Sequence, residues 1–202
     1  MKIALVGATG NVGQRVVAEA ISRGHTVTAI ARKVSDLAAG NGVIPVAVDV
    51  TSQGAAAVLS GHDCVVLSVR FQGLDFENIL RTVKASGVAR LLIVGGAASL
   101  EVKPGLALID TPEFPAVIKP EAEPARQALN RLRQVTDLDW TFLSPSVFFG
   151  PGERTGKFRL AGDTLLTAVD GKSHISYEDY AIALLDEIEQ PKHHRTRFTV
   201  GY

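Results

Sequence analysis

The glycine-rich segment Gly7-Ala8-Thr9-Gly10-Asn11-Val12-Gly13 has the residue types and spacing of a turn that binds phosphate. An apolar run at residues 3–6 precedes it and apolar residues at helical spacing follow it, so it joins a buried strand to a helix. In such a turn Gly7 permits the tight bend, Gly10 lets backbone approach a pyrophosphate, and Gly13 lets the helix pack closely on the strand. The free N–H groups at the helix N-terminus attract phosphate. We therefore predict a dinucleotide site here, with an ordinary tight turn as the alternative. Its predicted cofactor-binding residues are Gly7, Thr9, Gly10, Asn11, Val12 and Gly13.

The end of the second predicted strand, at residues 26–31, indicates which dinucleotide binds. NAD-binding proteins commonly place Asp or Glu there, about 20 residues beyond the glycines, to accept from the ribose 2′-hydroxyl. This chain has Arg32 and Lys33 instead, and the nearest acid, Asp36, lies beyond them. Because an arginine can bind a phosphate bidentately, the pair favours NADP(H) over NAD(H). Two solvated surface cations are the alternative interpretation.

The elements that must position these residues alternate between strand and helix. The predicted strands are 3–6, 26–31, 43–50, 64–69, 91–94, 140–143 and 198–200. The predicted helices are 12–21, 55–59, 76–87, 125–135 and 177–188, the last beginning at a capping-box-like pair, Ser176 and Asp179. Parallel strands need crossover helices, so the pattern predicts an α/β fold of the Rossmann type, a doubly wound, mostly parallel sheet with helices on both faces. We expect one NAD(P)-binding domain over 1–202, in which about 150–202 form a small C-terminal substrate-side lobe.

Residues 97–124 break this rhythm because they contain five prolines. The segment predicts a long loop, with a turn of helix as an alternative for part of it, and such loops in compact domains tend to be functional or disordered. The sequence does not decide whether this loop closes over a substrate.

The composition excludes several classes of protein. The 202 residues carry 21 basic and 21 acidic side chains, and this neutral balance argues against a nucleic-acid-binding surface. No apolar run reaches the roughly 18 residues of a membrane span, and no signal peptide is evident.

The single cysteine, Cys64, permits no internal disulfide, so we expect a cytoplasmic protein. A homo-oligomer is compatible with the neutral charge. His193 and His194 lack accompanying Cys or carboxylate ligands, so we expect no metal site.

Three segments resemble a known family. GATGNVG at 7–13, VGGAASLEVKPG at 94–105 and LDWTFLSPSVFFGPGERTGKFRLAGDTLL at 138–166 are similar to the NADH-flavin reductases. These are small, atypical members of the extended short-chain dehydrogenase group, related to NmrA-like and biliverdin reductase B-like proteins. The resemblance runs from Lys2 to Tyr202.

The resemblance implies further cofactor contacts at the ends of successive strands. Asp49 and Val50 would flank the adenine, and Leu67, Ser68, Val69 and Arg70 would lie near the ribose and pyrophosphate. The residues that would frame the nicotinamide are Gly95, Gly96, Ala97, Ser144, Pro145, Ser146, Val147 and Phe148. Each of these positions has an ordinary loop or packing role as its alternative.

The candidate catalytic residues are fewer. Short-chain dehydrogenases usually carry Tyr-x-x-x-Lys on the helix after the fifth strand, but residues 116–126 contain no tyrosine, and Tyr177 and Tyr180 lie on a face that resembles packing. Ser99 is the candidate to orient substrate or relay a proton, and Lys119 the candidate to steer an anionic substrate. A loop-capping serine and a solvated lysine are the alternatives. Phe148 and Phe149 are candidates to stack on a flat ring, or core aromatics.

These residues favour an NADPH-dependent oxidoreductase that passes hydride to a flavin, quinone or similar flat small-molecule acceptor. A flavin would be a substrate rather than a prosthetic group, and the cofactors would carry the chemistry while the protein aligns them. The first alternative is an NmrA-like redox-sensing module that binds NADP(H) without turnover. The second is an isomerase or lyase that uses NAD(P) internally.

Overall fold

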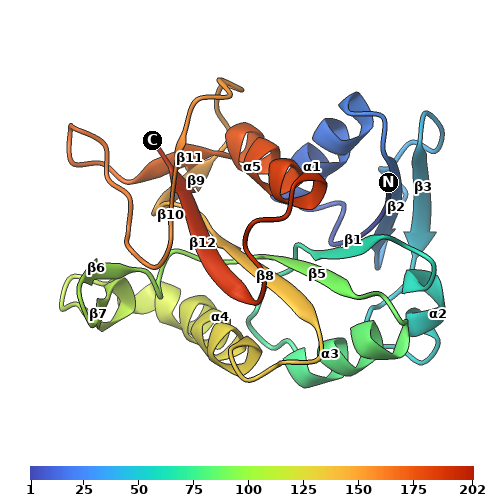
Figure 1. Ribbon diagram of the computed structural model, residues 1–202, viewed down its shortest axis with the longest axis horizontal. Helices are drawn as coiled ribbons and strands as arrows, with labels where there is room; N and C mark the ends of the chain where they lie inside the picture. The colour runs from blue at the N-terminus through green and yellow to red at the C-terminus, as the bar shows by residue number, and fades with distance from the viewer.

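The computed structural model describes all 202 residues and is built on one eight-stranded sheet. The strand order is β10-β12-β8-β5-β4-β1-β2-β3, and every neighbouring pair is parallel except β10 and β12 (Figure 1). The strands of this sheet are β1 (Lys2–Val6), β2 (Thr26–Ala31), β3 (Val43–Ala47), β4 (Cys64–Leu67), β5 (Arg90–Val94), β8 (Asp139–Ser144), β10 (Arg159–Ala161) and β12 (Thr196–Gly201). The helices are α1 (Asn11–Ser22), α2 (Ala55–Leu59), α3 (Phe76–Ala85), α4 (Lys119–Leu132) and α5 (Tyr177–Glu189).

The sheet separates two hydrophobic layers. Alternate residues of each buried strand face opposite sides, so Ile3 and Leu5 pack with α1 and α5, whereas Ala4 and Val6 pack with α2, α3 and α4. The two layers of helices lie above and below the strands in Figure 1. This arrangement confirms the predicted Rossmann-type α/β fold with helices on both faces.

The strand order reverses at β1, which pairs with β2 on one side and β4 on the other. In open α/β sheets a crevice forms at the carboxyl ends of the strands at such a point. The glycine-rich turn follows β1, so the topology places it at this crevice.

The predicted structure of residues 97–135 is wrong in its detail. The segment contains a short hairpin of β6 (Glu101–Lys103) and β7 (Leu106–Ala107), then the 3-10 helices η1 (Leu108–Asp110) and η2 (Ala116–Ile118). Helix α4 begins at Lys119, six residues before the predicted start, because Pro120 lies in the first turn, where no N–H is needed. Pro124 lies inside the helix and removes one backbone hydrogen bond, which the packing of the following alanines and leucines against the sheet outweighs.

The strand predicted at 198–200 is confirmed as part of β12, but three short strands between residues 148 and 176 escaped prediction. β9 (Phe148–Gly150) pairs in parallel with β11 (His174–Ser176), and β10 is the antiparallel edge of the main sheet. β3 ends at Ala47 rather than at residue 50. The predicted helix start at Ser176 is confirmed, since its side chain accepts from the Asp179 N–H at 3.0 Å.

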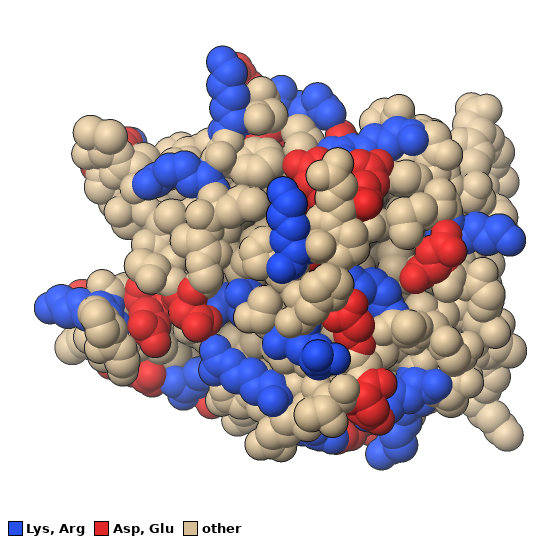
Figure 2. All heavy atoms as spheres, in the orientation of Figure 1, with Lys and Arg blue, Asp and Glu red and all other residues tan.

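The surface agrees with the balanced composition. On the face shown in Figure 2, basic and acidic side chains are intermixed. No helix combines the length and the apolar character needed to cross a lipid bilayer.

Gly95 lies where the end of β5 meets the buried Phe142 ring. A Cβ at Gly95 would lie 2.1 Å from Phe142 Cε1, and Phe142 is fully buried. We expect Gly95→Ala to lower the free energy of unfolding by about 1–3 kcal/mol, because the ring must leave its packed position. Urea unfolding measures this, with Gly96→Ala as the control, since nothing lies within 4 Å of a Cβ there. Equal losses in the two variants would contradict this steric explanation.

Candidate functional site

The turn after β1 requires glycine at two positions. Gly7 has φ of +86°, and a Cβ there would lie 1.9 Å from the Ser68 carbonyl oxygen. A Cβ at Gly13 would lie 2.2 Å from the Gly7 carbonyl oxygen. The turn is therefore pressed against both the end of β4 and the first turn of α1, as predicted for a close strand–helix approach.

The N-terminus of α1 is open at this turn. Gly10 is the N-cap and provides no side-chain hydrogen bond to the first-turn N–H groups. The positive end of the helix dipole points toward the turn, a combination that binds anions.

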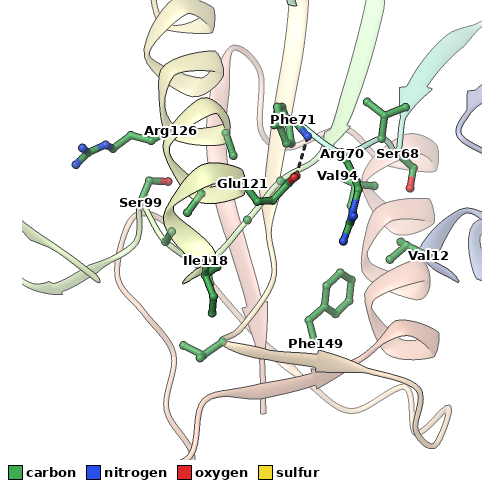
Figure 3. A pocket seen from close by; sticks show the side chains of 18 of the residues that line it. Val12, Ser68, Arg70, Phe71, Val94, Ser99, Ile118, Glu121, Arg126 and Phe149 are labelled. Atoms are coloured by element: carbon green, nitrogen blue, oxygen red, sulfur yellow. Dashed lines mark hydrogen bonds between the residues drawn. The ribbon is translucent and has the colours of Figure 1, made fainter. Parts of the chain in front are cut away.

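A cavity of about 700 Å³ adjoins the turn. Its volume lies within the range of small-molecule sites. Its walls come from the turn, the loops after β4 and β5, the cavity side of α4, β9 and the start of α5, as Figure 3 shows in part. Fourteen of its 24 lining residues are hydrophobic. The cavity therefore suits a ligand with an apolar body.

Eleven of the predicted site residues line this cavity. They are Thr9, Gly10, Asn11, Val12, Ser68, Val69, Arg70, Gly95, Gly96, Ala97 and Ser99. Val147, named with the nicotinamide contacts, also lines it. The loops at three successive strand ends thus converge on one space.

Other predicted contacts lie outside the cavity. Leu67 and Val50 are buried in the core, and Ser144 is fully buried. Ser146 is buried with its hydroxyl donating to the Val200 carbonyl. Pro145 lies between these two serines and does not line the cavity. Their side chains do not reach a ligand in this cavity, so any contact there would come through backbone atoms.

Phe148 and Lys119 face solvent. Phe148 is 66% exposed, and its neighbour Phe149 lines the cavity instead. Consecutive residues of a strand point to opposite sides, so β9 can direct only one of the two rings inward. Lys119 is exposed at the first position of α4 and is not part of the cavity wall.

The basic pair lies after β2, which neighbours β1 on the side away from β4 and β5. Arg32 and Lys33 directly follow β2, are exposed and form no salt bridge. Asp49, predicted beside the adenine, accepts from the Thr51 hydroxyl at 2.6 Å and the Thr51 N–H at 2.9 Å. These hydrogen bonds, with help from the nearby Arg32 charge, hold the pKa of Asp49 below its ordinary value. Both cations are thus available to a ligand.

Several cavity residues were not predicted. Glu121 projects from α4 and accepts from the Phe71 N–H at 2.7 Å and the Gln72 N–H at 3.3 Å (Figure 3). Arg126 pairs with Asp110 at 2.7 Å and Glu123 at 2.6 Å. Glu121 thereby fixes the loop after β4, and Arg126 fixes the segment before α4. The signal in the sequence was the acidic residue Glu121 at the third position of α4. The predicted start of this helix at residue 125 left Glu121 outside it.

Two further cavity residues carry charge or aromatic surface. Arg70 forms no salt bridge and points into the cavity between Val12 and Phe149 (Figure 3). The Tyr177 ring lies edge-on to Phe149 with 4.7 Å between ring centroids, so Tyr177 lines the cavity rather than serving only in packing. Tyr180 is fully buried and donates to the Leu143 carbonyl at 2.7 Å, as expected for a packing residue.

A buried carboxylate supports the cavity wall from behind. Asp179 accepts from the N–H groups of Thr155 and Gly156 at 2.8 Å each and from the Tyr202 hydroxyl at 2.7 Å. Burial opposes ionisation, but these hydrogen bonds and one from the Thr155 hydroxyl outweigh it and lower the pKa of Asp179 from its ordinary 3.8. Asp179 therefore ties the loop after β9 to α5.

This shift predicts an acid-sensitive contribution to stability. Because the folded pKa lies below the unfolded one, Asp179 stabilises the protein fully above about pH 4, and the contribution is lost as the pH falls through the folded pKa. Asp179→Asn should have a lower free energy of unfolding at pH 7 and a shallower decline below pH 4. Urea unfolding across pH checks this, and parallel pH curves for the two proteins would contradict the assignment.

Comparison with known proteins agrees with this geometry. Residues 7–191 match the NAD(P)H-binding family. A structure described as an exported protein from Burkholderia pseudomallei is 42% identical, covers 100% of both chains and superposes with a TM-score of 0.91. A provisionally named epimerase from Bacteroides thetaiotaomicron is 40% identical over 100% of this chain and 96% of its own, with a TM-score of 0.94. A provisionally named NADH-flavin reductase from Streptococcus pneumoniae is 36% identical over 100% and 99%, with a TM-score of 0.88.

The names of these three relatives differ, so they agree on the fold and not on one reaction. The family match includes the glycine-rich turn, both layers of helices and every strand that reaches the cavity. The chain belongs to the NAD(P)H-binding family.

Proposed function

We propose that this protein is an NADPH-dependent oxidoreductase that passes hydride to a flavin, a quinone or a similar flat acceptor. The observation that carries the proposal is the mainly apolar cavity directly beside the phosphate-binding turn, with no tyrosine on the α4 wall. A reaction between two ring systems needs alignment more than it needs an acid–base pair.

The residues present fit NADPH. The turn and the open N-terminus of α1 would hold the pyrophosphate, and the unpaired Arg32 and Lys33 would hold the 2′-phosphate. When bound, the dinucleotide supplies the hydride. The Gly95–Ala97 segment lines the cavity where the nicotinamide would lie.

The acceptor side suits a flat ring. Phe149, Phe71 and Ile118 offer apolar surface to the cavity from three different elements. An isoalloxazine or quinone ring would stack there and exclude water while the hydride is transferred. After the transfer, the reduced ring would take a proton from solvent.

The test is a titration with NADPH and NADH, followed by an acceptor screen. We expect acceptor-dependent oxidation of NADPH with at least one of FMN, FAD, riboflavin and menadione. Tight NADPH binding with no oxidation by any of them would contradict the proposal.

A redox sensor without turnover is the second candidate. The absence of a tyrosine from α4 favours it, because the usual acid–base pair of this fold is then missing. It predicts NADP(H) affinity without an acceptor-dependent rate.

We further propose a cytoplasmic location, a small-molecule partner rather than nucleic acid or membrane, and assembly into a homo-oligomer. The buried thiol of Cys64, whose pKa burial raises to about 12, is consistent with a reduced, unreactive cysteine. The exported relative makes fractionation of the native host the decisive measurement of location.

A further inference from the structure

Arg197 on β12 is an unusually buried arginine. Its side chain is 2% exposed, and burial lowers its pKa even though the Asp163 carboxylate opposes that change. Arginines are seldom fully buried unless their charge is paired, because desolvation is costly.

The guanidinium of Arg197 has two partners, the carboxylate of Asp163 and the residue Ser99. Its Nε donates to Asp163 at 2.6 Å, but Asp163 is half exposed and also pairs with Arg133 at 3.3 Å. Nη2 also contacts the Asp163 carboxylate and donates to the Ser99 carbonyl at 3.3 Å, and Nη1 donates to the Ser99 hydroxyl at 3.2 Å. The guanidinium thus holds Ser99 by both its backbone and its side chain.

This contact determines the hydrogen-bonding role of the Ser99 hydroxyl. A guanidinium only donates, so the Ser99 oxygen must accept from it, and the hydroxyl retains one donor for another partner. Ser99 finds no protein acceptor for that proton and lies on the cavity wall beside the first turns of α4 (Figure 3). The cavity is the place where the remaining donor can be used.

We propose that Arg197 is a positioning residue for Ser99. It occupies the Ser99 oxygen as an acceptor, so that the Ser99 hydroxyl acts as a hydrogen-bond donor to the electron-accepting substrate. The inference rests on the proposed function and specifies its substrate class, an acceptor with a carbonyl oxygen or ring nitrogen at its reducible end. When a quinone takes up the hydride, two electrons and one hydrogen enter the ring and a carbonyl oxygen becomes negative. The Ser99 O–H stabilises that oxygen, and water then supplies the second proton.

The experiment is a double-mutant cycle on Ser99→Ala and Arg197→Met, with menadione as acceptor. Each single variant should lower kcat about tenfold, the effect of one lost hydrogen bond. KM for NADPH should stay unchanged. The double variant should be no slower than Arg197→Met, because the arginine acts through the serine. Arg197→Lys should restore part of the rate.

Arg133→Met is the matched control, since Arg133 pairs with the same Asp163 but does not contact Ser99. It should keep the wild-type kcat. Independent, multiplicative losses in the double variant, or an equal loss in Arg133→Met, would overturn the inference. If Arg197→Met fails to fold, the same cycle is run with Arg197→Lys.

Two readouts without turnover separate this inference from the proposed function. Riboflavin titration in the presence of NADP⁺ should show weaker binding in both single variants and no further loss in the double variant. Urea unfolding should show coupling between the two positions. A wild-type protein that reduces no acceptor contradicts the proposed function. If Ser99 and Arg197 are coupled only in urea unfolding, and not in riboflavin binding, the arginine has a structural role and the inference fails. Absence of coupling in every readout overturns the inference even for an active enzyme.

Discussion

Replacement of Arg32 by alanine should weaken NADPH binding about 10- to 150-fold and leave NADH binding nearly unchanged. Hydrogen bonds to a charged group are worth about 1.5–3 kcal/mol, and each 1.4 kcal/mol is tenfold in affinity. Arg32 is exposed and forms no salt bridge, so its loss leaves no buried charge that would disturb the fold. The 2′-phosphate is the group that distinguishes the two cofactors, so the effect should fall on NADPH alone.

Titration of both dinucleotides against the wild type and Arg32→Ala measures this ratio. Arg131→Ala is a charge-matched control, because Arg131 pairs with Glu77 on the surface of α4. That variant should bind both cofactors as the wild type does. Equal losses of NADPH and NADH affinity in Arg32→Ala would assign the arginine to the shared part of the dinucleotide.

Gly13→Ala should greatly weaken the binding of both dinucleotides. Helix propensity alone would favour alanine by about 1 kcal/mol. The added Cβ, however, would lie 2.2 Å from the Gly7 carbonyl oxygen, and real contacts do not occur at that distance. Relieving such overpacking typically costs about 1–3 kcal/mol, and here the backbone that moves is the glycine-rich turn proposed to hold the pyrophosphate. The steric effect therefore exceeds the propensity gain, and we expect a loss of tenfold or more for NADPH and NADH alike.

Isothermal titration gives both affinities, and urea unfolding reports stability separately. Ala18→Gly is the control, because Ala18 is exposed on the same helix and its replacement lowers stability by about 1 kcal/mol without changing the turn. If Gly13→Ala binds both dinucleotides normally, the turn is not the pyrophosphate site.

The fold was largely predictable because its signals are local. Apolar runs such as residues 3–6 and the periodic apolar positions of α1 and α5 follow from which residues must face the two cores. The errors fall where local signals conflict with packing. Five prolines in 97–124 indicated a loop, yet α4 begins at Lys119 because one proline occupies its first turn and its inner face packs on the sheet.

The candidate site was predictable only in part. The glycine-rich turn was predictable because the close approach of strand and helix requires glycine at fixed positions, Gly7 and Gly13. Phe148 and Phe149 were both candidates to stack on a ring, because the short strand β9, which determines which ring faces inward, carries no periodic signal of its own. Ser99 was found as a candidate, but its partner Arg197 lies 98 residues away.

The sequence by itself determined that this chain has a mostly parallel α/β sheet, a glycine-rich turn between the first strand and the first helix, and two cations without an acid at the end of the second strand. Those features depend on neighbours within a few residues. The tertiary structure alone decided that the turn adjoins an apolar cavity, that Glu121 fixes the loop after β4, and that a buried arginine holds Ser99. Such contacts join distant segments, and their positions follow from how the helices pack on the sheet rather than from local preference.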